Sequence, residues 1–289
     1  MDLQSLHSLS WNTYRYVGDY LHDAAVILLL GHVFCRRSVA GFSRRTQSLY
    51  LVLYIARYLD LLDHSQHTYL VAHKLFFIGT AAAALCAFCL WSQTYQKQSD
   101  TCPAFLLALV TLFLSPWVAT EGDVMEIMWT WSQILEGFAM VPQYICSYRN
   151  SCDGQKDECG VATYICFMGF YRIFYILNWM HKKARAFHYW DPHSWLGGAV
   201  NLCFFADYLL FLAVGISCLR RVTLSLDDGV HQVGDELRDR FGGCLLSPGQ
   251  RYFDIGPAAD LELRGQPERQ DGVLPATLGA QSEPTGPAE

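Results

Sequence analysis

The sequence predicts an all-α membrane protein followed by a polar tail. Hydrophobic residues make up 52% of the 289 residues and charged residues only 17%, whereas about 25% of a typical soluble domain is charged. Residues 225–289 contain 12 acidic and 5 basic side chains, whereas residues 1–224 contain 15 and 16. This composition argues against a soluble enzyme, and the lack of a basic stripe argues against a nucleic-acid binder.

Seven apolar segments are candidates for membrane-spanning helices, which need about 20 mostly apolar residues each. They are residues 16–35, 49–62, 69–91, 103–120, 124–146, 162–180 and 195–219, of which the second is short and charged. The first ten residues are polar and lack a basic n-region and a cleavage site, so the first span is expected to act as an uncleaved signal anchor. The expected organisation is a lumenal extension (1–13), a seven-span domain (14–224) and an acidic, disordered cytosolic tail (225–289).

Basic residues near the span ends predict the orientation, because they concentrate on the cytosolic side. They follow the first, third, fifth and seventh spans: Arg36, Arg37, Arg44, Arg45, Lys97, Arg149, Lys156, Arg220 and Arg221. The N-terminus is therefore expected in the lumen and the C-terminus in the cytosol. The loop after the sixth span is also basic but lumenal (His181, Lys182, Lys183, Arg185 and His188). It is either an ordinary solvated loop or a positive mouth that attracts an anionic ligand.

Ionisable side chains within the spans predict a water-filled cavity, because such groups are costly in lipid. They are Arg15, Asp19, His22, Asp23, Arg57, Asp60, Glu126, Glu136, Arg172 and Asp207. Ser48 precedes Arg57 by nine residues, and Thr163 precedes Arg172 by the same distance. Spans 1–3 and 5–7 are therefore candidates for parallel repeats joined by span 4, with chance similarity as the alternative. In a true repeat, Arg57 and Arg172 would face each other across the cavity.

The charges also indicate the chemistry of a ligand. Two arginines and a basic mouth suit several carboxylates, which guanidinium binds through paired hydrogen bonds. Glu126 and Trp129 share a helical face and suit a cation, although Trp129 alone is also typical of an interfacial anchor. Together they favour a zwitterionic peptide over a sugar. His22 is a candidate pH switch, because an imidazole titrates near pH 6.5, or else a helix-packing group.

Cysteine usage predicts neither a disulfide nor a metal site. Most of the 11 cysteines lie in apolar spans, where small buried residues are expected. Cys152 and Cys159 flank an acidic loop on the cytosolic side, where a stable disulfide is not expected. No cofactor is expected.

Six strings occur along the chain: YRYVGDYLHDAA (14–25), AGFSRRTQ (40–47), ARYLDLL (56–62), MEIMWTWSQILEGFAMVPQ (125–143), GFYRIFYILNW (169–179) and ADY (206–208). In this order they resemble the KDEL receptors, which retrieve escaped endoplasmic-reticulum (ER) proteins by a C-terminal Lys-Asp-Glu-Leu-type tetrapeptide. The resemblance covers residues 15–226 and implies a SWEET/PQ-loop-like fold, in which a linker helix joins two three-helix bundles. Pro142-Gln143 resembles the PQ motif of that superfamily, and its proline would kink a helix end.

The resemblance also implies roles for individual residues. Three cations would hold the carboxylates of the ligand, namely Arg15, Arg57 and Lys182. Of these, Arg57 would bind the terminal carboxylate. The ligand lysine would be held by Glu126 and Trp179, with Trp129 close by. A polar network would rearrange on binding: Asp60, Tyr171, Arg172 and Asn178. His22, near Asp19, would sense pH, and a Glu136–Tyr171 hydrogen bond would lock the acidic, ligand-bound state. Asp191 and Asp207 would be linked to transport.

The implied function is retrieval. Protonated His22 would favour a state that binds the peptide in the mildly acidic Golgi, and its deprotonation in the ER would release cargo. The expected partners are the tetrapeptide, the bilayer and a cytosolic COPI coat or adaptor, which Arg220 and Arg221 could recruit; replacing His22 by Ala should flatten the pH dependence.

Three departures from the family pattern bear on these expectations. Lys182 stands where the family has arginine, so the peptide preference can differ, or Arg185 can substitute. The chain starts about ten residues early, and some sixty residues follow the string TLSL (223–226), with a short helix expected around 234–241.

The alternative functions are a SWEET/PQ-loop-type small-solute transporter and an intramembrane enzyme. Glu126 and Glu136 are ten residues apart, which is about 15 Å along a helix, so they form no obvious catalytic dyad.

Overall fold

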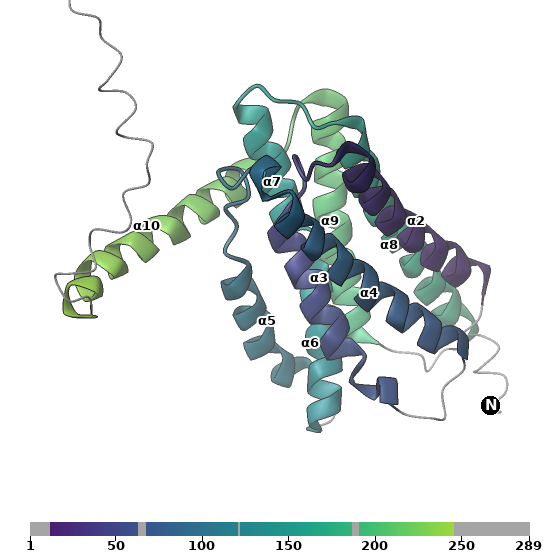
Figure 1. The fold of residues 1–289 in the computed structure, drawn as a ribbon. Coiled ribbons are helices and arrows are strands. Elements are labelled where there is room, and N and C mark those ends of the chain that lie inside the picture. Colours follow the sequence, from purple (N-terminus) through teal and green to yellow (C-terminus); the bar gives the residue numbers. More distant parts are fainter. Residues whose placement is uncertain (1–11, 63–67, 121, 187–190, 246–289) are drawn as a thin grey trace, which may run out of the picture. The chain divides into compact units, whose positions relative to one another are not determined.

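The computed structural model describes residues 12–62, 68–120, 122–186 and 191–245, and the regular secondary structure within these residues is helical (Figure 1). The elements are α2 (Thr13–Arg36), α3 (Arg44–Arg57), η1 (Leu59–Leu62), α4 (Thr68–Leu90), η2 (Ser92–Thr94), α5 (Ala104–Val118), α6 (Val124–Phe138), α7 (Val141–Cys152), α8 (Cys159–Arg185), α9 (Pro192–Val214) and α10 (Leu219–Leu245).

Four helices among the described residues are long and apolar enough to cross a membrane, namely α2, α4, α8 and α9. Helix α5 is apolar but has only 15 residues, and α3 has 14 and is followed by the short helix η1. The span expected over 124–146 is not one helix. It divides into α6 and α7 just before Pro142, whose ring and missing N–H disfavour a continuous helix.

Helix packing follows a paired pattern (Figure 1). The most extensive interface joins α2 to α8. A second pair is formed by α3 and α6. Helix α4 contacts both α2 and α3, and α9 contacts both α6 and α8, whereas α5 lies beside α6. If α2, α3 and α4 are matched with α6–α7, α8 and α9, each contact in the first set has a counterpart in the second.

Local sequence fixes the starts of the helices that build the interior. Asn12 caps α2 by accepting from the Arg15 N–H, and its amide donates to Asn178 Oδ1 at 2.7 Å, so α2 begins against α8. Gln143 of the Pro-Gln pair accepts from the Ser43 N–H at 2.9 Å and donates to the Gly41 carbonyl at 2.8 Å. The motif therefore ties α7 to the turn that precedes α3.

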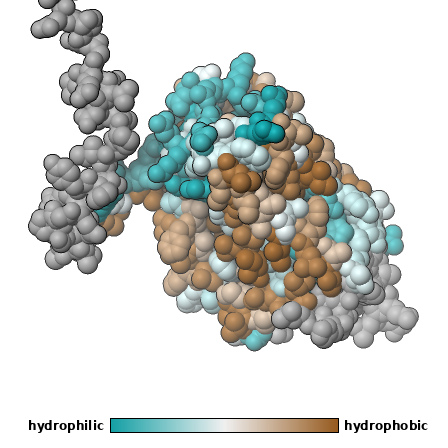
Figure 2. All heavy atoms as spheres, in the orientation of Figure 1, coloured by the Kyte–Doolittle hydropathy of each residue, from teal (hydrophilic) through white to brown (hydrophobic). Residues whose placement is uncertain are grey.

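Basic residues that follow the first and fifth expected spans lie together at one end of the bundle. Arg45 of α3 donates to the carbonyls of Thr101 and Cys102, and Gly41 N–H donates to Gln96 at 2.9 Å. Arg149 at the end of α7 pairs with Asp227 at 2.7 Å. Figure 2 shows hydrophilic atoms gathered at the upper end of the bundle and hydrophobic atoms over the middle of the face in view.

The boundary expected at residue 224 falls inside α10, and residues 225–245, expected to be disordered, are helical. The expected helix at 234–241 is part of α10. Contacts divide the chain into two units, residues 1–233 and residues 234–289. In the first unit, Asp207 accepts the N–H groups of Cys218 and Leu219 at 2.7 and 3.1 Å, so a carboxylate on α9 caps the start of α10. Residues 246–289 and most of the extension 1–13 lie outside the described residues.

The expected burial of the cysteines is wrong for most of them. Cys102 and Cys146 are buried, whereas the other described cysteines are exposed or half-buried. The pair Cys86 and Cys89 has CxxC spacing on α4, but both side chains are exposed and no metal-binding group of three ligands occurs among the described residues. These side chains face outward from the spans, where an apolar environment tolerates a thiol.

Candidate functional site

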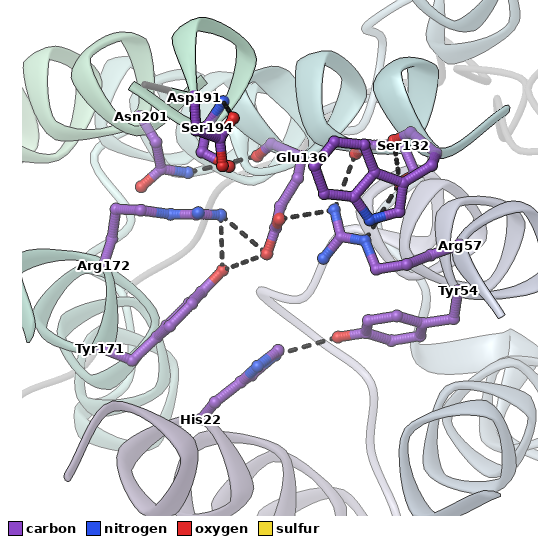
Figure 3. Close-up of polar contacts among 11 residues, drawn as sticks. His22, Tyr54, Arg57, Ser132, Glu136, Tyr171, Arg172, Asp191, Ser194 and Asn201 are labelled. Carbon is purple, nitrogen blue, oxygen red and sulfur yellow. Dashed lines mark hydrogen bonds and ion pairs between the residues drawn. The ribbon is translucent and has the colours of Figure 1, made fainter. Parts of the chain in front are cut away.

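The site is organised around one buried carboxylate. Glu136 of α6 is 4% exposed and binds two arginines from different helices. Arg57 Nη2 of α3 lies 2.7 Å from Glu136 Oε2, and Arg172 Nη2 of α8 lies 2.7 Å from Oε1 (Figure 3). Tyr171 donates its hydroxyl to Oε1 at 2.9 Å, which forms the expected Glu136–Tyr171 bond. The two guanidinium groups thus share one carboxylate within the protein interior, and the cluster has one positive charge in excess.

The two arginines occupy equivalent positions in their helices. Helix α3 begins at Arg44, thirteen residues before Arg57, and α8 begins at Cys159, thirteen residues before Arg172. Ser48 donates to the carbonyl of Arg44 at 3.0 Å, and Thr163 donates to that of Cys159 at 2.7 Å. The spacing seen in the sequence therefore corresponds to one helical register repeated in α3 and α8, and it brings both guanidinium groups to the same carboxylate.

His22 of α2 lies beside this cluster and is 5% exposed. Its ring is stacked on Tyr171 at 4.3 Å between centroids and on Phe77 at 4.5 Å. Its Nε2 lies 2.9 Å from Tyr54 Oη (Figure 3). The imidazole thus contacts the tyrosine that binds Glu136, so its charge can affect the cluster directly.

A cavity of about 210 Å³ opens beside these residues. Most of the residues that the sequence assigned to ligand binding line it, namely Arg15, Arg57, Trp129, Tyr171, Asn178, Trp179 and Lys182. An adjoining cavity of about 280 Å³ shares Arg15, Arg57 and Trp129 with it. The second cavity is lined by Asp19 and Asp60, which pair with Arg15 and Lys74.

Neighbouring helices hold the walls of the cavity in place. A side chain added at Gly198 of α9 would lie 2.5 Å from Trp179 Cζ3, so only glycine lets this ring lie against α9. Arg57 is fixed further by α6, because its Nε and Nη2 donate to the hydroxyl and carbonyl of Ser132, each at 3.0 Å. The cavity is therefore built between the α2–α8 and α3–α6 pairs.

Some expected site residues lie elsewhere. Glu126, in the first turn of α6, accepts from Thr120 Oγ1 at 3.0 Å and lines neither cavity. Lys183 and Arg185 also line neither, so Lys182 is the described basic residue at the end of α8 that reaches the cavity. His188 lies outside the described residues. Of the basic residues at the end of α8, Lys182 is therefore the one that adds positive charge to the cavity.

The two acidic residues expected to act in transport, Asp191 and Asp207, lie toward opposite ends of α9. Asp191 caps α9 by accepting from the Ser194 N–H at 3.1 Å and lines the cavity. Asp207 is buried at the other end of α9, where Tyr148 donates to it at 2.9 Å. Arg220 lies there on α10, over the ring of Phe211 at 5.3 Å, and Arg221 is exposed.

The sequence did not single out several residues of the site. Gln133, Tyr58 and Ser194 line the cavity, and His73 of α4 lies 3.4 Å from Asp23 Oδ2 at the edge of the adjoining one. Gln133 lies one helical turn after Trp129, so helical spacing could have found it. His73 and Asp23 belong to different spans, and their proximity depends on the packing of α2 against α4.

Several known proteins are similar to this chain in sequence. Residues 38–182 match the model of a family described as the ER lumen protein retaining receptor. A protein named ER lumen protein-retaining receptor from Petunia hybrida is 30% identical over 208 residues, covering 69% of this chain and 93% of that protein. A like-named protein of Caenorhabditis elegans is 30% identical over 74% and 99% of the two chains, and one of Drosophila melanogaster is 31% identical over 68% and 91%.

Proposed function

The chain belongs to the family of ER lumen protein-retaining receptors, and we propose that its polar cavity binds the C-terminal Lys-Asp-Glu-Leu-like signals of soluble ER proteins. It is a receptor of ER and Golgi membranes rather than an enzyme. The observation that carries the proposal is the convergence of Arg15, Arg57 and Lys182 on one cavity. A peptide that ends in two acidic side chains and a free carboxylate offers three anionic groups to these cations.

The aromatic wall suits the other end of such a peptide. Trp129 and Trp179 line the same cavity as the three cations, and Asp191 supplies a carboxylate at its edge. An indole face and a carboxylate both attract an ammonium group. With Glu126 turned toward Thr120, Asp191 is the acidic residue best placed for the ligand lysine.

Arg57 indicates how a ligand carboxylate can enter the ion cluster. Its guanidinium is bound to Glu136 and Ser132 in the structure, and it also lines the cavity. A terminal carboxylate can replace Glu136 at Arg57, because Glu136 keeps Arg172 and Tyr171 as partners. Ligand binding is thereby coupled to the side chains that His22 contacts.

We further propose a seven-span architecture of two three-helix bundles, with α5 as the linker. Three features support it: the matched contacts of α2, α3 and α4 with those of α6–α7, α8 and α9, the shared register of Arg57 and Arg172, and the position of Pro142-Gln143 at the start of α7. In this arrangement the basic end faces the cytosol and the cavity opens to the lumen.

The proposed pH dependence follows from the charges that share the cavity. A proton on His22 and a carboxylate of the ligand attract each other, so each promotes the binding of the other. The faces of Tyr171 and Phe77 and the carboxylate of Glu136 favour a charged His22. Arg57 and Arg172 oppose it, so a ligand carboxylate that offsets these arginines favours the proton on His22. The peptide should therefore bind more tightly in the acidic Golgi than in the neutral ER, which gives retrieval its direction.

Replacing His22 by Phe tests this role, because phenylalanine keeps a ring between Tyr171 and Phe77 but carries no proton. Affinity for a peptide ending in Lys-Asp-Glu-Leu would be measured at pH values of about 5.5 and 7.5, which bracket an ordinary histidine pKa. The wild type should bind more tightly at the lower pH, and His22→Phe should bind equally at both.

His73→Phe is the matched control, because His73 lies at the adjoining cavity and pairs with Asp23. This variant should keep the pH dependence. If His73→Phe abolishes the pH dependence of peptide binding and His22→Phe does not, the responsible proton binds His73, which contradicts the proposed mechanism.

Return to the ER requires a cytosolic signal, which we place at the start of α10. Asp207 caps this helix, and Arg220 and Arg221 follow within its first turn. Because Asp191 and Asp207 lie on the same helix, α9 connects the cavity to this end. A coat or adaptor that reads Arg220 and Arg221 would couple cargo binding to retrograde transport.

A further inference from the structure

We propose that a second, apolar groove, formed by α5, α7, α9 and the start of α10, holds an acyl chain of a membrane phospholipid. The groove measures about 540 Å³, within the range of about 300–1,000 Å³ that is usual for small-molecule sites. Leu106, Val110 and Leu114 line it from α5, and Leu226 and Val230 line it from α10. It shares no residue with the polar cavity.

The polar side chains of the lining have partners within the protein, and the Asp227 oxygen that accepts no hydrogen bond, Oδ1, lies 3.7 Å from His231 Nε2. Thr111 Oγ1 donates to the carbonyl of Leu107 at 2.9 Å, and Thr223 Oγ1 donates to that of Leu219 at 2.9 Å. Asp227 is bound by Arg149 and Thr101. A polar ligand would therefore gain little here, whereas an alkyl chain would bury apolar surface on every side.

The surface around the groove identifies its occupant. Phe105, Leu109, Phe113 and Trp117 recur at every fourth position of α5 and are between 43% and 81% exposed. In a membrane protein such a stripe faces lipid, and the groove lies on an adjacent face of the same helix. Lipid tails therefore reach the groove without crossing any polar surface, and a protein partner would first have to displace them.

Helix α10 gives the acyl chain a structural role. The polar face of its first turns is fixed to the bundle by the Asp227–Arg149 pair and by the His231 Nε2–Thr101 carbonyl contact of 2.8 Å. Its apolar residues Leu226 and Val230 face the groove. An acyl chain between these residues and α5 would complete the packing of α10 against the bundle, because it fills the space that the polar contacts leave open.

The test uses the full-length receptor in nanodiscs that contain a phosphatidylcholine with a photoactivatable diazirine on one acyl chain. After irradiation, mass spectrometry maps the labelled residues, and native mass spectrometry counts the lipids that remain bound. We expect adducts on Leu106, Val110, Leu226 and Val230, together with a retained lipid. Val110→Trp should fill the groove, abolish the adducts on Leu226 and Val230 and release the lipid.

Leu109→Trp is the matched control, because Leu109 is exposed on the same helix but does not line the groove. It should leave the adducts and the retained lipid unchanged. Leu226→Trp fills the groove from α10 and gives a second variant if Val110→Trp fails to fold, as judged by peptide binding. The proposal is overturned if the groove residues stay unlabelled while Leu109 and Phe113 are labelled, if lipid is retained equally in both groove variants, or if the groove instead cross-links to protein.

Discussion

Glu136 is the residue on which the two halves of the bundle depend most directly. Its carboxylate pairs with Arg57 of α3 and with Arg172 of α8, and it accepts a hydrogen bond from the hydroxyl of Tyr171. A buried ion cluster of this kind contributes little net stability when complete but is costly to leave incomplete. The cluster therefore holds the arginines in place and remains sensitive to any added charge.

Replacing Glu136 by Gln should destabilise the receptor, because two buried guanidinium groups would lose their shared counter-charge. The cost of breaking such a buried pair is about 3–5 kcal/mol. The midpoint of thermal unfolding in detergent should fall by several degrees.

Glu158→Gln provides the control, because Glu158 is exposed and pairs with His32 at the other end of the bundle. Its unfolding midpoint should stay close to that of the wild type. Equal midpoints for the two variants would show that the cluster does not have the role assigned to it.

At the scale of elements, close helix contacts decide the shape of the cavity. Helices α6 and α9 meet at Gly137 and Gly197, where an added side chain on Gly197 would lie 2.6 Å from the backbone oxygen of Gln133. Gln133 and Trp129 line the cavity from α6, and Asp191 and Ser194 line it from α9. Any separation of these helices should therefore change both stability and binding.

Gly197→Ala should weaken the α6–α9 contact, because a backbone atom cannot move aside as a side-chain end can. Overpacking of this kind costs about 1–3 kcal/mol. We expect a lower unfolding midpoint and weaker peptide binding. Gly79→Ala on α4 is the control, since nothing lies within 4 Å of the added atom, and it should gain about 0.5–1 kcal/mol of helix stability. A Gly197→Ala variant as stable as Gly79→Ala would contradict the packing described.

The sequence predicts some elements better than others, for physical reasons. Long apolar segments give α2, α4, α8 and α9 directly, and the arginine spacing anticipates the shared register of α3 and α8. Hydropathy alone does not detect the break between α6 and α7, although Pro142 is its local cause. Glu126 shares a helical face with Trp129, but it lies at the helix start, where Thr120 binds it.

At the scale of the whole molecule, the basic residues that follow the first, third, fifth and seventh expected spans lie at one end, and the cavity lies at the other, together with the basic end of α8. At one end Arg45 contacts Thr101, Arg149 contacts Asp227 and Arg220 contacts Cys152. The cavity end contains Asn12, Asp60 and Asp191. Charge counting predicts this sorting, but it does not reveal that α10 binds the basic end. That contact depends on Asp227 and His231, which belong to a region that composition alone assigns to a disordered tail.

The sorting predicts the orientation of both termini. An N-glycosylation acceptor sequence attached before residue 1 should be glycosylated, because the proposed topology puts that end in the lumen. The same sequence attached after residue 289 should remain unmodified, because the proposed topology puts that end in the cytosol. Glycosylation of the C-terminal tag would reverse the proposed topology and place the cavity on the wrong side of the membrane for cargo.

The proposed function requires that this cavity recognise the free C-terminal carboxylate of its ligand. The most direct test compares two peptides ending in Lys-Asp-Glu-Leu, one with a free carboxylate and one with a terminal amide, on the wild type and on Arg57→Gln at pH about 5.5. We predict that amidation weakens binding to the wild type by about 100-fold and has little further effect on Arg57→Gln, because the carboxylate and Arg57 act as a pair. Equal affinity of the wild type for both peptides would contradict the account.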